Sequence, residues 1–193
     1  EIIMICGGAS YTYYFEWSLL DISILALSTG LINGASSMTV AHELIHRNGH
    51  MERTLGQLIL TMNMYPHFYI EHLLGHHKNI GTSHDAGTSR RNESLYKYLP
   101  RAIFTAYTDS WNLAVKYNRH HVMYLYHLFV ALFGWFMFSI AGVMGLYYML
   151  LQSIVEILFL ETINYIEHYG LVREPSDKVT IMHSWNTDKI STN

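Results

Sequence analysis

The strongest constraint on the fold is the apolar stretch 124–160, in which Glu156 is the only Asp, Glu, Lys or Arg. Carried on to His168 as one helix, it would be roughly 68 Å long at about 1.5 Å per residue, whereas the hydrocarbon core of a bilayer is about 30 Å thick. The stretch must therefore fold back on itself, giving membrane spans at about 123–141 and 145–167. We expect the reversal at three small residues, Ala141, Gly142 and Gly145.

A second stretch, 18–40, also has the length and apolar character of a span, with Asp21 as its only charge. The chain is 50% hydrophobic and only 14% charged, whereas a soluble domain carries about a quarter charged residues. Lipid is therefore the expected solvent for much of the chain. The sequence predicts an all-α, integral-membrane helical bundle that forms a single domain over 1–193.

The basic residues predict which side of the membrane each loop occupies. Nine of the twelve Lys and Arg residues lie between Arg47 and Arg119, and none lies in 120–172. Because loops rich in Lys and Arg stay in the cytoplasm, the segment 47–119 and the tail 173–193 are both expected there. Two crossings between them satisfy this rule.

The first histidine motif, His42-Glu43-Leu44-Ile45-His46, falls at the cytoplasmic end of the first expected span. Positions i and i+4 share a helix face, so both rings can reach one metal ion. The HExxH pattern also occurs in zinc metalloproteases, where the glutamate is the general base.

A second motif, Glu71-His72-Leu73-Leu74-Gly75-His76-His77, supplies three more imidazoles. His72 and His76 are again four residues apart, and a helix here presents three ring nitrogens toward one side. A zinc protease needs only one ligand beyond HExxH, so this supply exceeds its requirement. Imidazole also suits iron.

The third element is the end of the last expected span, where Glu161, Asn164 and His168 form one stripe of a helix. An ionisable residue inside a span is costly and marks a functional candidate. We therefore expect Glu161 and Asn164 to face the metal cavity. The alternative is that both serve helix packing through hydrogen bonds.

The strings HELIHR, EHLLGHHKNIGTSHD and NYIEHYGL resemble, in sequence and order, three signatures of alkane hydroxylases, members of the membrane fatty-acid desaturase and hydroxylase superfamily. Ala86 stands where that family usually has proline, and the family's final motif, roughly LQRHSDHH, is missing. We therefore expect an internal fragment that is inactive alone. The resemblance implies that iron ligands lie at His42, His46, His72, His76, His77 and His168.

The resemblance further implies a monooxygenase that inserts one oxygen atom of O₂ into the terminal C–H bond of an alkane, giving a 1-alkanol. Its cofactors would be two non-haem irons at a cytoplasmic site, reduced by a rubredoxin-type electron carrier. The protein would be multi-pass in the bacterial inner membrane, with a lipophilic substrate from the bilayer and no nucleic-acid partner. The carboxylates expected to orient imidazoles and moderate charge are Glu43, Glu71, Glu161 and Glu167.

Three alternatives remain from the sequence. The nearest is a related membrane di-iron enzyme, either a fatty-acyl desaturase or hydroxylase or a xylene monooxygenase. An intramembrane zinc metalloprotease would account for HExxH alone. The last alternative is a membrane module that binds metal without catalysis.

Overall fold

The computed structural model describes residues 3–8 and 17–185, and every regular element within those ranges is a helix. The chain forms two compact units. The first comprises Glu1–Tyr69 and Arg119–Leu160, and the second comprises Ile70–Asn118 and Glu161–Asn193. The all-α expectation is confirmed for the described residues.

The first unit begins with a helical turn at 3–8, followed by α2 (Leu19–Ala35) and α3 (Ser37–His46). Ser18 caps α2 reciprocally with Asp21, which explains why the helix starts there. The expected span 18–40 is not one continuous helix, because Ser36 (φ −118°, ψ −68°) separates α2 from α3. The break gives the HExxH motif a short helix of its own.

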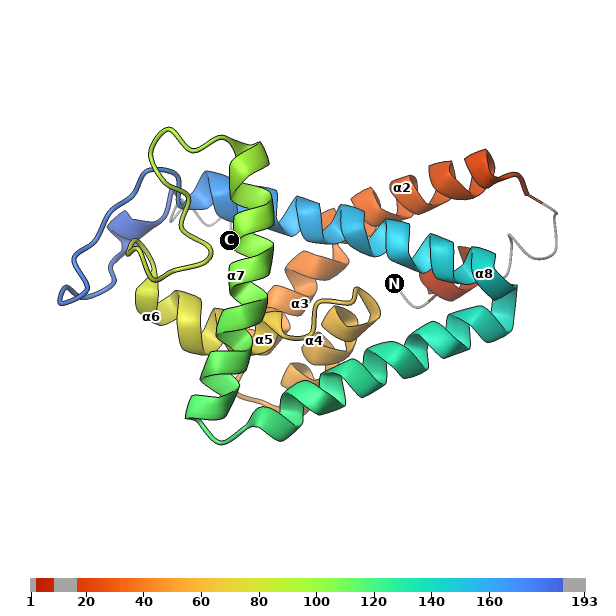
Figure 1. Ribbon diagram of the computed structural model, residues 1–193, viewed down its shortest axis with the longest axis horizontal. Helices are drawn as coiled ribbons and strands as arrows, with labels where there is room; N and C mark the ends of the chain where they lie inside the picture. The colour runs from red at the N-terminus through yellow and green to blue at the C-terminus, as the bar shows by residue number, and fades with distance from the viewer. Residues whose placement is uncertain (1–2, 9–16, 186–193) are drawn as a thin grey trace. The chain divides into compact units, whose positions relative to one another are not determined.

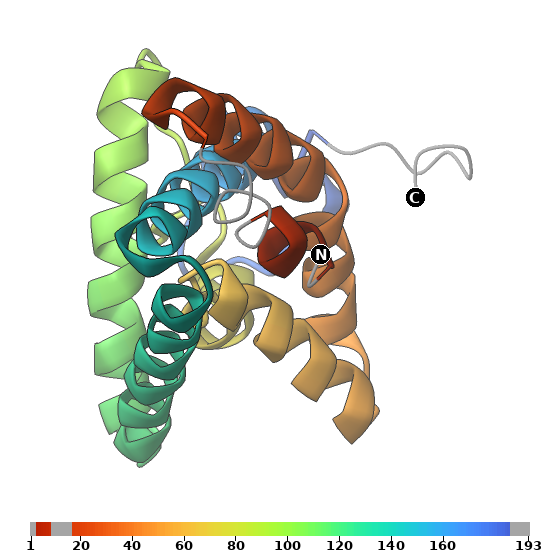
Figure 2. The same ribbon diagram turned by 90° about the vertical axis from the view of Figure 1, so that its right-hand side faces the viewer.

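Two further helices complete this unit. These are α4 (His50–Met62) and the long α8 (His120–Glu167), whose last seven residues belong to the second unit. Non-helical angles at Ala141 and Gly142 divide α8 into two arms, and Figures 1 and 2 show it doubling back there. The predicted reversal is confirmed. Gly142 has φ +58°, which favours glycine, and a Cβ on Gly145 would collide with the carbonyl oxygen of Met137.

The core of the first unit lies where α2 meets the two arms of α8. A Cβ on Gly30 would come within 2.7 Å of Val155, so small residues let these helices approach closely. Thr29 and Tyr148 share a hydrogen bond of 3.0 Å inside this contact. The buried apolar residues at the centre are Ile5, Ile22, Ala26, Met137, Ala141, Tyr148 and Met149.

Two described stretches are long and apolar enough to cross a membrane, Leu19–His46 and His120–Glu167. Most of the apolar window in each stays exposed, with Trp135 and Val143 more than two-thirds exposed. By length and composition, both stretches therefore keep the properties that the sequence predicts for membrane spans.

The second unit carries the remaining motifs on short elements around α7 (Leu95–Lys116). A helical run passes from α5 (Phe68–Glu71) through a π-helix (His72–His76) to α6 (His77–Asn79). The loop 80–94 follows, and a 3₁₀ turn, Ile181–His183, lies near the end of the described chain. α7 packs through a stripe of small residues at every fourth position, namely Ala102, Ala106, Ser110 and Ala114.

Candidate metal centre

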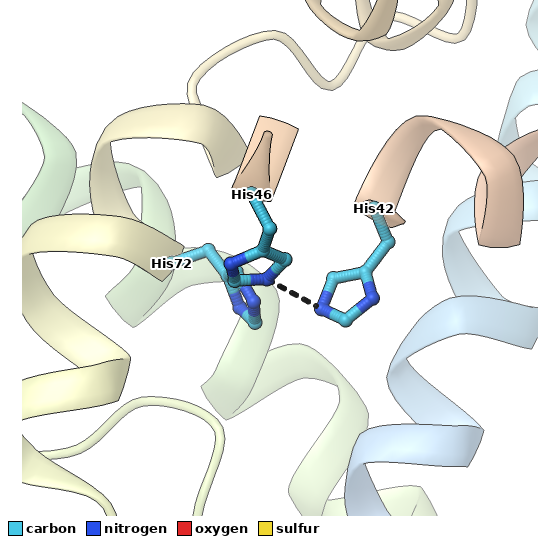
Figure 3. Close-up of side chains that lie close together, drawn as sticks. All are labelled: His42, His46 and His72. Atoms are coloured by element: carbon cyan, nitrogen blue, oxygen red, sulfur yellow. Dashed lines mark hydrogen bonds between the residues drawn. The ribbon is translucent and has the colours of Figure 1, made fainter. Parts of the chain in front are cut away.

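His42 and His46 form a facing pair on α3 in the first unit. Their Nε2 atoms lie 3.2 Å apart, and the rings meet edge to face (Figure 3). Two imidazoles on one metal, each about 2.0–2.1 Å from it, would hold their nitrogens about 2.9–3.4 Å apart. The spacing therefore fits a shared ion. The prediction that i and i+4 bring these rings together is confirmed.

A second facing pair, His72 and His77, lies in the second unit. Their Nε2 atoms are 3.0 Å apart. The sequence predicted a regular helix with His72 and His76 in register, but the backbone N–H of His77 donates to the carbonyl of His72, five residues back. This π-turn places position i+5 over position i, so His77 faces His72. Its nitrogen spacing also fits one metal ion.

The His76 ring is stacked on the His72 ring, with centroids 5.2 Å apart, and it has further neighbours in the second unit. Nδ1 of His76 lies 3.0 Å from both carboxylate oxygens of Asp85, and the His76 and His168 rings are 4.8 Å apart. Nδ1 of His168 lies 3.0 Å from the backbone carbonyl oxygen of His183. A metal-bound imidazole characteristically donates its other N–H to a carboxylate or carbonyl. In both rings Nδ1 has such a partner, which is the arrangement expected of an imidazole that binds a metal through Nε2.

Burial and neighbouring charges shift the pKa values of three side chains in the second unit. Burial raises the pKa of Glu71 to about 8, although His76 opposes the shift. Burial alone would lower the pKa of His76, but the nearby carboxylates, Asp85 first, raise it to about 9. Burial and the charge of His76 lower the pKa of His168 to about 4. A cationic group is therefore favoured beside Asp85, and a metal ion would take the place of the His76 proton.

Asp85 is the important residue that sequence reasoning left without a role. Its side chain is fully buried, and it accepts hydrogen bonds from the Thr88 hydroxyl and, at 3.2 Å, from the Gly87 N–H. His76 favours the ionised form, so the pKa of Asp85 is lowered despite the opposing effect of burial. The only available signal was a carboxylate nine residues after a histidine in a loop.

Among the carboxylates expected to assist the metal, Glu161 and Glu71 are buried. Glu161 accepts a hydrogen bond of 3.3 Å from the Asn164 amide. Tyr98 was not predicted. Its hydroxyl oxygen lies 3.0 Å from the carbonyl oxygen of Gly87 and 3.3 Å from the Glu161 carboxylate, so its one hydrogen is shared between these two acceptors beside His76.

Glu43 and Glu167 lie in more open surroundings. The Glu43 carboxylate forms an exposed ion pair with Arg47 at 3.7 Å. Glu167 is half-buried, and its backbone carbonyl accepts from the N–H of Trp185. Neither contact identifies a role at the metal.

A family model for fatty acid desaturases matches residues 20–192. Alkane 1-monooxygenase 2 of Alcanivorax borkumensis is 37% identical over 86% of this chain and 47% of its own length. Alkane 1-monooxygenase 2 of Pseudomonas aeruginosa is 36% identical over 99% of this chain and 54% of its own. The xylene/toluene monooxygenase hydroxylase component XylM of Pseudomonas putida is 27% identical over 86% of this chain and 48% of its own length.

The chain thus spans about half the length of the curated relatives it matches. The match to the family model nevertheless covers all three histidine motifs and the elements that carry them. The chain therefore belongs to the fatty acid desaturase family, and alkane 1-monooxygenases are among its relatives.

Proposed function

We propose that the protein is an alkane 1-monooxygenase that inserts one oxygen atom of O₂ into a terminal C–H bond, giving a 1-alkanol. The observation that carries the proposal is the pair of facing imidazoles in each unit, with nitrogens 3.2 and 3.0 Å apart. Relatives with this printed name, 31–37% identical to the chain, support the choice of reaction.

The proposed ligands are all imidazoles, and they fit iron. His42 and His46 would hold a metal through one pair and His72 and His77 through the other, while His76 and His168 present Nε2 within the second unit. That the six share one centre with two irons is a prediction from the sequence. An unactivated C–H bond offers no acid–base handle, so bound iron would supply the redox chemistry that zinc lacks.

The residues around these imidazoles have separate tasks in this proposal. Asp85 holds His76 in the tautomer that leaves Nε2 for the metal, and the carbonyl of His183 does the same for His168. Glu161, held by Tyr98 and Asn164, provides a buried carboxylate at which a proton can be kept. Glu71 lies beside the π-turn, where the positive charge of a bound metal would favour its ionised form and be moderated by it.

The proposed setting is the bacterial inner membrane. The spans would be 18–40, 123–141 and 145–167, with the metal site at the cytoplasmic side because the basic residues gather in 47–119. A substrate dissolved in lipid would reach the site between helices. An acidic, rubredoxin-type carrier would deliver electrons to the basic cytoplasmic face.

The test uses the whole membrane-embedded protein, supplied with a reductant, isotopically labelled O₂ and a linear alkane. We expect a 1-alkanol carrying one labelled oxygen, together with iron that copurifies with the protein. His42→Ala removes a proposed ligand and should abolish both the product and the bound iron. His84→Ala removes a histidine outside the proposed ligands and is the matched control. Formation of a carbon–carbon double bond in an acyl chain would instead establish a desaturase.

A xylene-type hydroxylase is the second candidate, supported by the relative named for that activity. Offering an alkane and xylene in the same assay separates the two. Oxidation of xylene alone would overturn the assignment of an alkane substrate, and zinc in place of iron would overturn the whole proposal.

A further inference from the structure

Arg173 is a buried cation whose partners are backbone carbonyls. The residue is 6% exposed, and its guanidinium donates to carbonyl oxygens of Lys78 (2.8 Å), Ile80 (2.8 Å), Glu174 (3.4 Å) and Asp177. Burying a charge is costly unless fixed dipoles or an opposite charge compensate it. Among residues 3–8 and 17–185, the groups that compensate this charge are these carbonyls, so their positions and that of Arg173 depend on each other.

These carbonyls belong to two segments that are far apart in the sequence. Lys78 and Ile80 lie at the end of the helical run that carries His72, His76 and His77, where carbonyls bear the negative end of the helix dipole. Arg173 itself follows His168 by five residues. The guanidinium therefore ties the second histidine motif to the third.

A chain of hydrogen bonds continues from this clamp to the metal-facing ring. The backbone N–H of Arg173 donates to the Gly81 carbonyl (2.7 Å), and the Gly81 N–H donates to the Thr88 hydroxyl oxygen (2.9 Å). Thr88 in turn donates to Asp85, which accepts from Nδ1 of His76. The chain thus runs without a break from the backbone of Arg173 to the His76 ring.

The geometry at Gly81 makes the connection tight. Gly81 has φ +77°, and a Cβ there would lie 3.0 Å from the Cβ of Arg173. Arg173 therefore packs closely against Gly81, whose backbone N–H anchors the Thr88 hydroxyl.

We propose that Arg173 is a positioning residue for the metal centre. It locks the segment after His168 to the end of the His72–His77 run, and through Gly81, Thr88 and Asp85 it fixes the orientation of the His76 ring. The inference rests on the proposed function, since it assigns Arg173 a role at that same site.

Lysine is a poor substitute at such a position. Its single ammonium cannot match the planar fork of arginine, which reaches carbonyls in both segments at once. We therefore expect Arg173→Lys to retain part of the iron affinity and Arg173→Met to retain less. Because residues that orient metal ligands typically influence affinity by 10–100-fold, we expect Arg173→Met to weaken iron binding by about that factor.

The experiment measures iron affinity in the whole protein by competition with a chelator and compares the Mössbauer spectra of the loaded variants. The variants are Arg173→Met, Arg173→Lys, Thr88→Val and the Arg173→Met/Thr88→Val double variant. The control is Lys178→Met, an exposed side chain in the loop after Arg173. Hydrogen exchange of peptides covering 78–88 in the metal-free protein provides a readout that needs no iron.

We expect Arg173→Met to accelerate exchange in 78–88, Thr88→Val to weaken iron binding with less effect on exchange, and the double variant to fall short of the product of the single losses. If Arg173→Met binds iron within about twofold of the unmodified protein, the inference is overturned but the proposed function stands. Should Arg173→Met fail to fold, the same result for Thr88→Val would overturn the inference. Failure of the unmodified protein to bind iron would overturn the proposed function and this inference together.

Discussion

Replacing Asp85 by asparagine changes one atom of the site's most constrained carboxylate. The ionised side chain accepts from His76, Thr88 and the Gly87 N–H, and it is fully buried. Asparagine has no charge and replaces one acceptor oxygen with a donor. Either His76 or Thr88 then faces an N–H, so the imidazole must turn or adopt the wrong tautomer for a metal at Nε2.

The expected loss of iron affinity is about 10–100-fold, equivalent to about 1.4–2.7 kcal/mol. The metal-free protein should lose about 1.5–3 kcal/mol of unfolding free energy, since a hydrogen bond to a charged group contributes that much. Chelator competition measures the first quantity and denaturant unfolding the second. Asp177→Asn, an exposed carboxylate, is the control. An Asp85→Asn protein that binds iron within twofold of the unmodified protein would refute the reasoning.

Three further predictions concern the turn of α8, an ion pair and a ligand. Gly145→Ala should destabilise the protein by about 1–3 kcal/mol because its Cβ meets a carbonyl oxygen. Gly134→Ala, where a Cβ meets only an ordinary contact, should stabilise the protein by up to about 1 kcal/mol. Thermal unfolding in detergent should therefore show a lower melting temperature for the first variant and a higher one for the second. Hydrogen bonds from Arg101 lower the pKa of Glu93, so their stabilisation is present at neutral pH and is lost as pH falls through that lowered pKa. Glu93→Gln should therefore flatten the acid side of a melting-temperature profile, and an unchanged profile would contradict this. His77→Ala removes a proposed ligand and should weaken iron binding more than Asp85→Asn, which removes only the support of one. An equal or smaller loss in chelator competition would contradict this.

Local periodicity made the helical parts of the fold predictable. The reversal at Ala141 and Gly142 followed from comparing the length of an apolar stretch with the thickness of a bilayer. The facing of His42 and His46 followed from the α-helical repeat alone. Both inferences needed only neighbours within one helix.

Contacts between distant segments were beyond that reasoning. Asp85 and Thr88 lie in a loop without periodicity, and their roles depend on where the loop folds back on His76. Arg173 was counted only as a charge that sets topology, although its guanidinium is buried against carbonyls 93 and 95 residues earlier. No local pattern separates such an arginine from a solvated one.

The π-turn shows what an α-helical repeat left out of the second motif. In a regular helix His76 would lie over His72, and His77 would point about 100° away from His76. The His72 and His76 rings are stacked as that repeat predicts, with centroids 5.2 Å apart, and moving one hydrogen bond from i−4 to i−5 also brings His77 to face His72.

One short segment thereby brings three imidazoles together, and Asp85 holds the His76 ring through its Nδ1. π-turns are rare, and those inside helices are frequent at functional sites. Gly75 lies inside this turn, where a Cβ would approach both Glu71 and Leu113 at 3.1 Å. A side chain at this position would therefore press on Glu71 and Leu113, and glycine lets the turn pack closely against both.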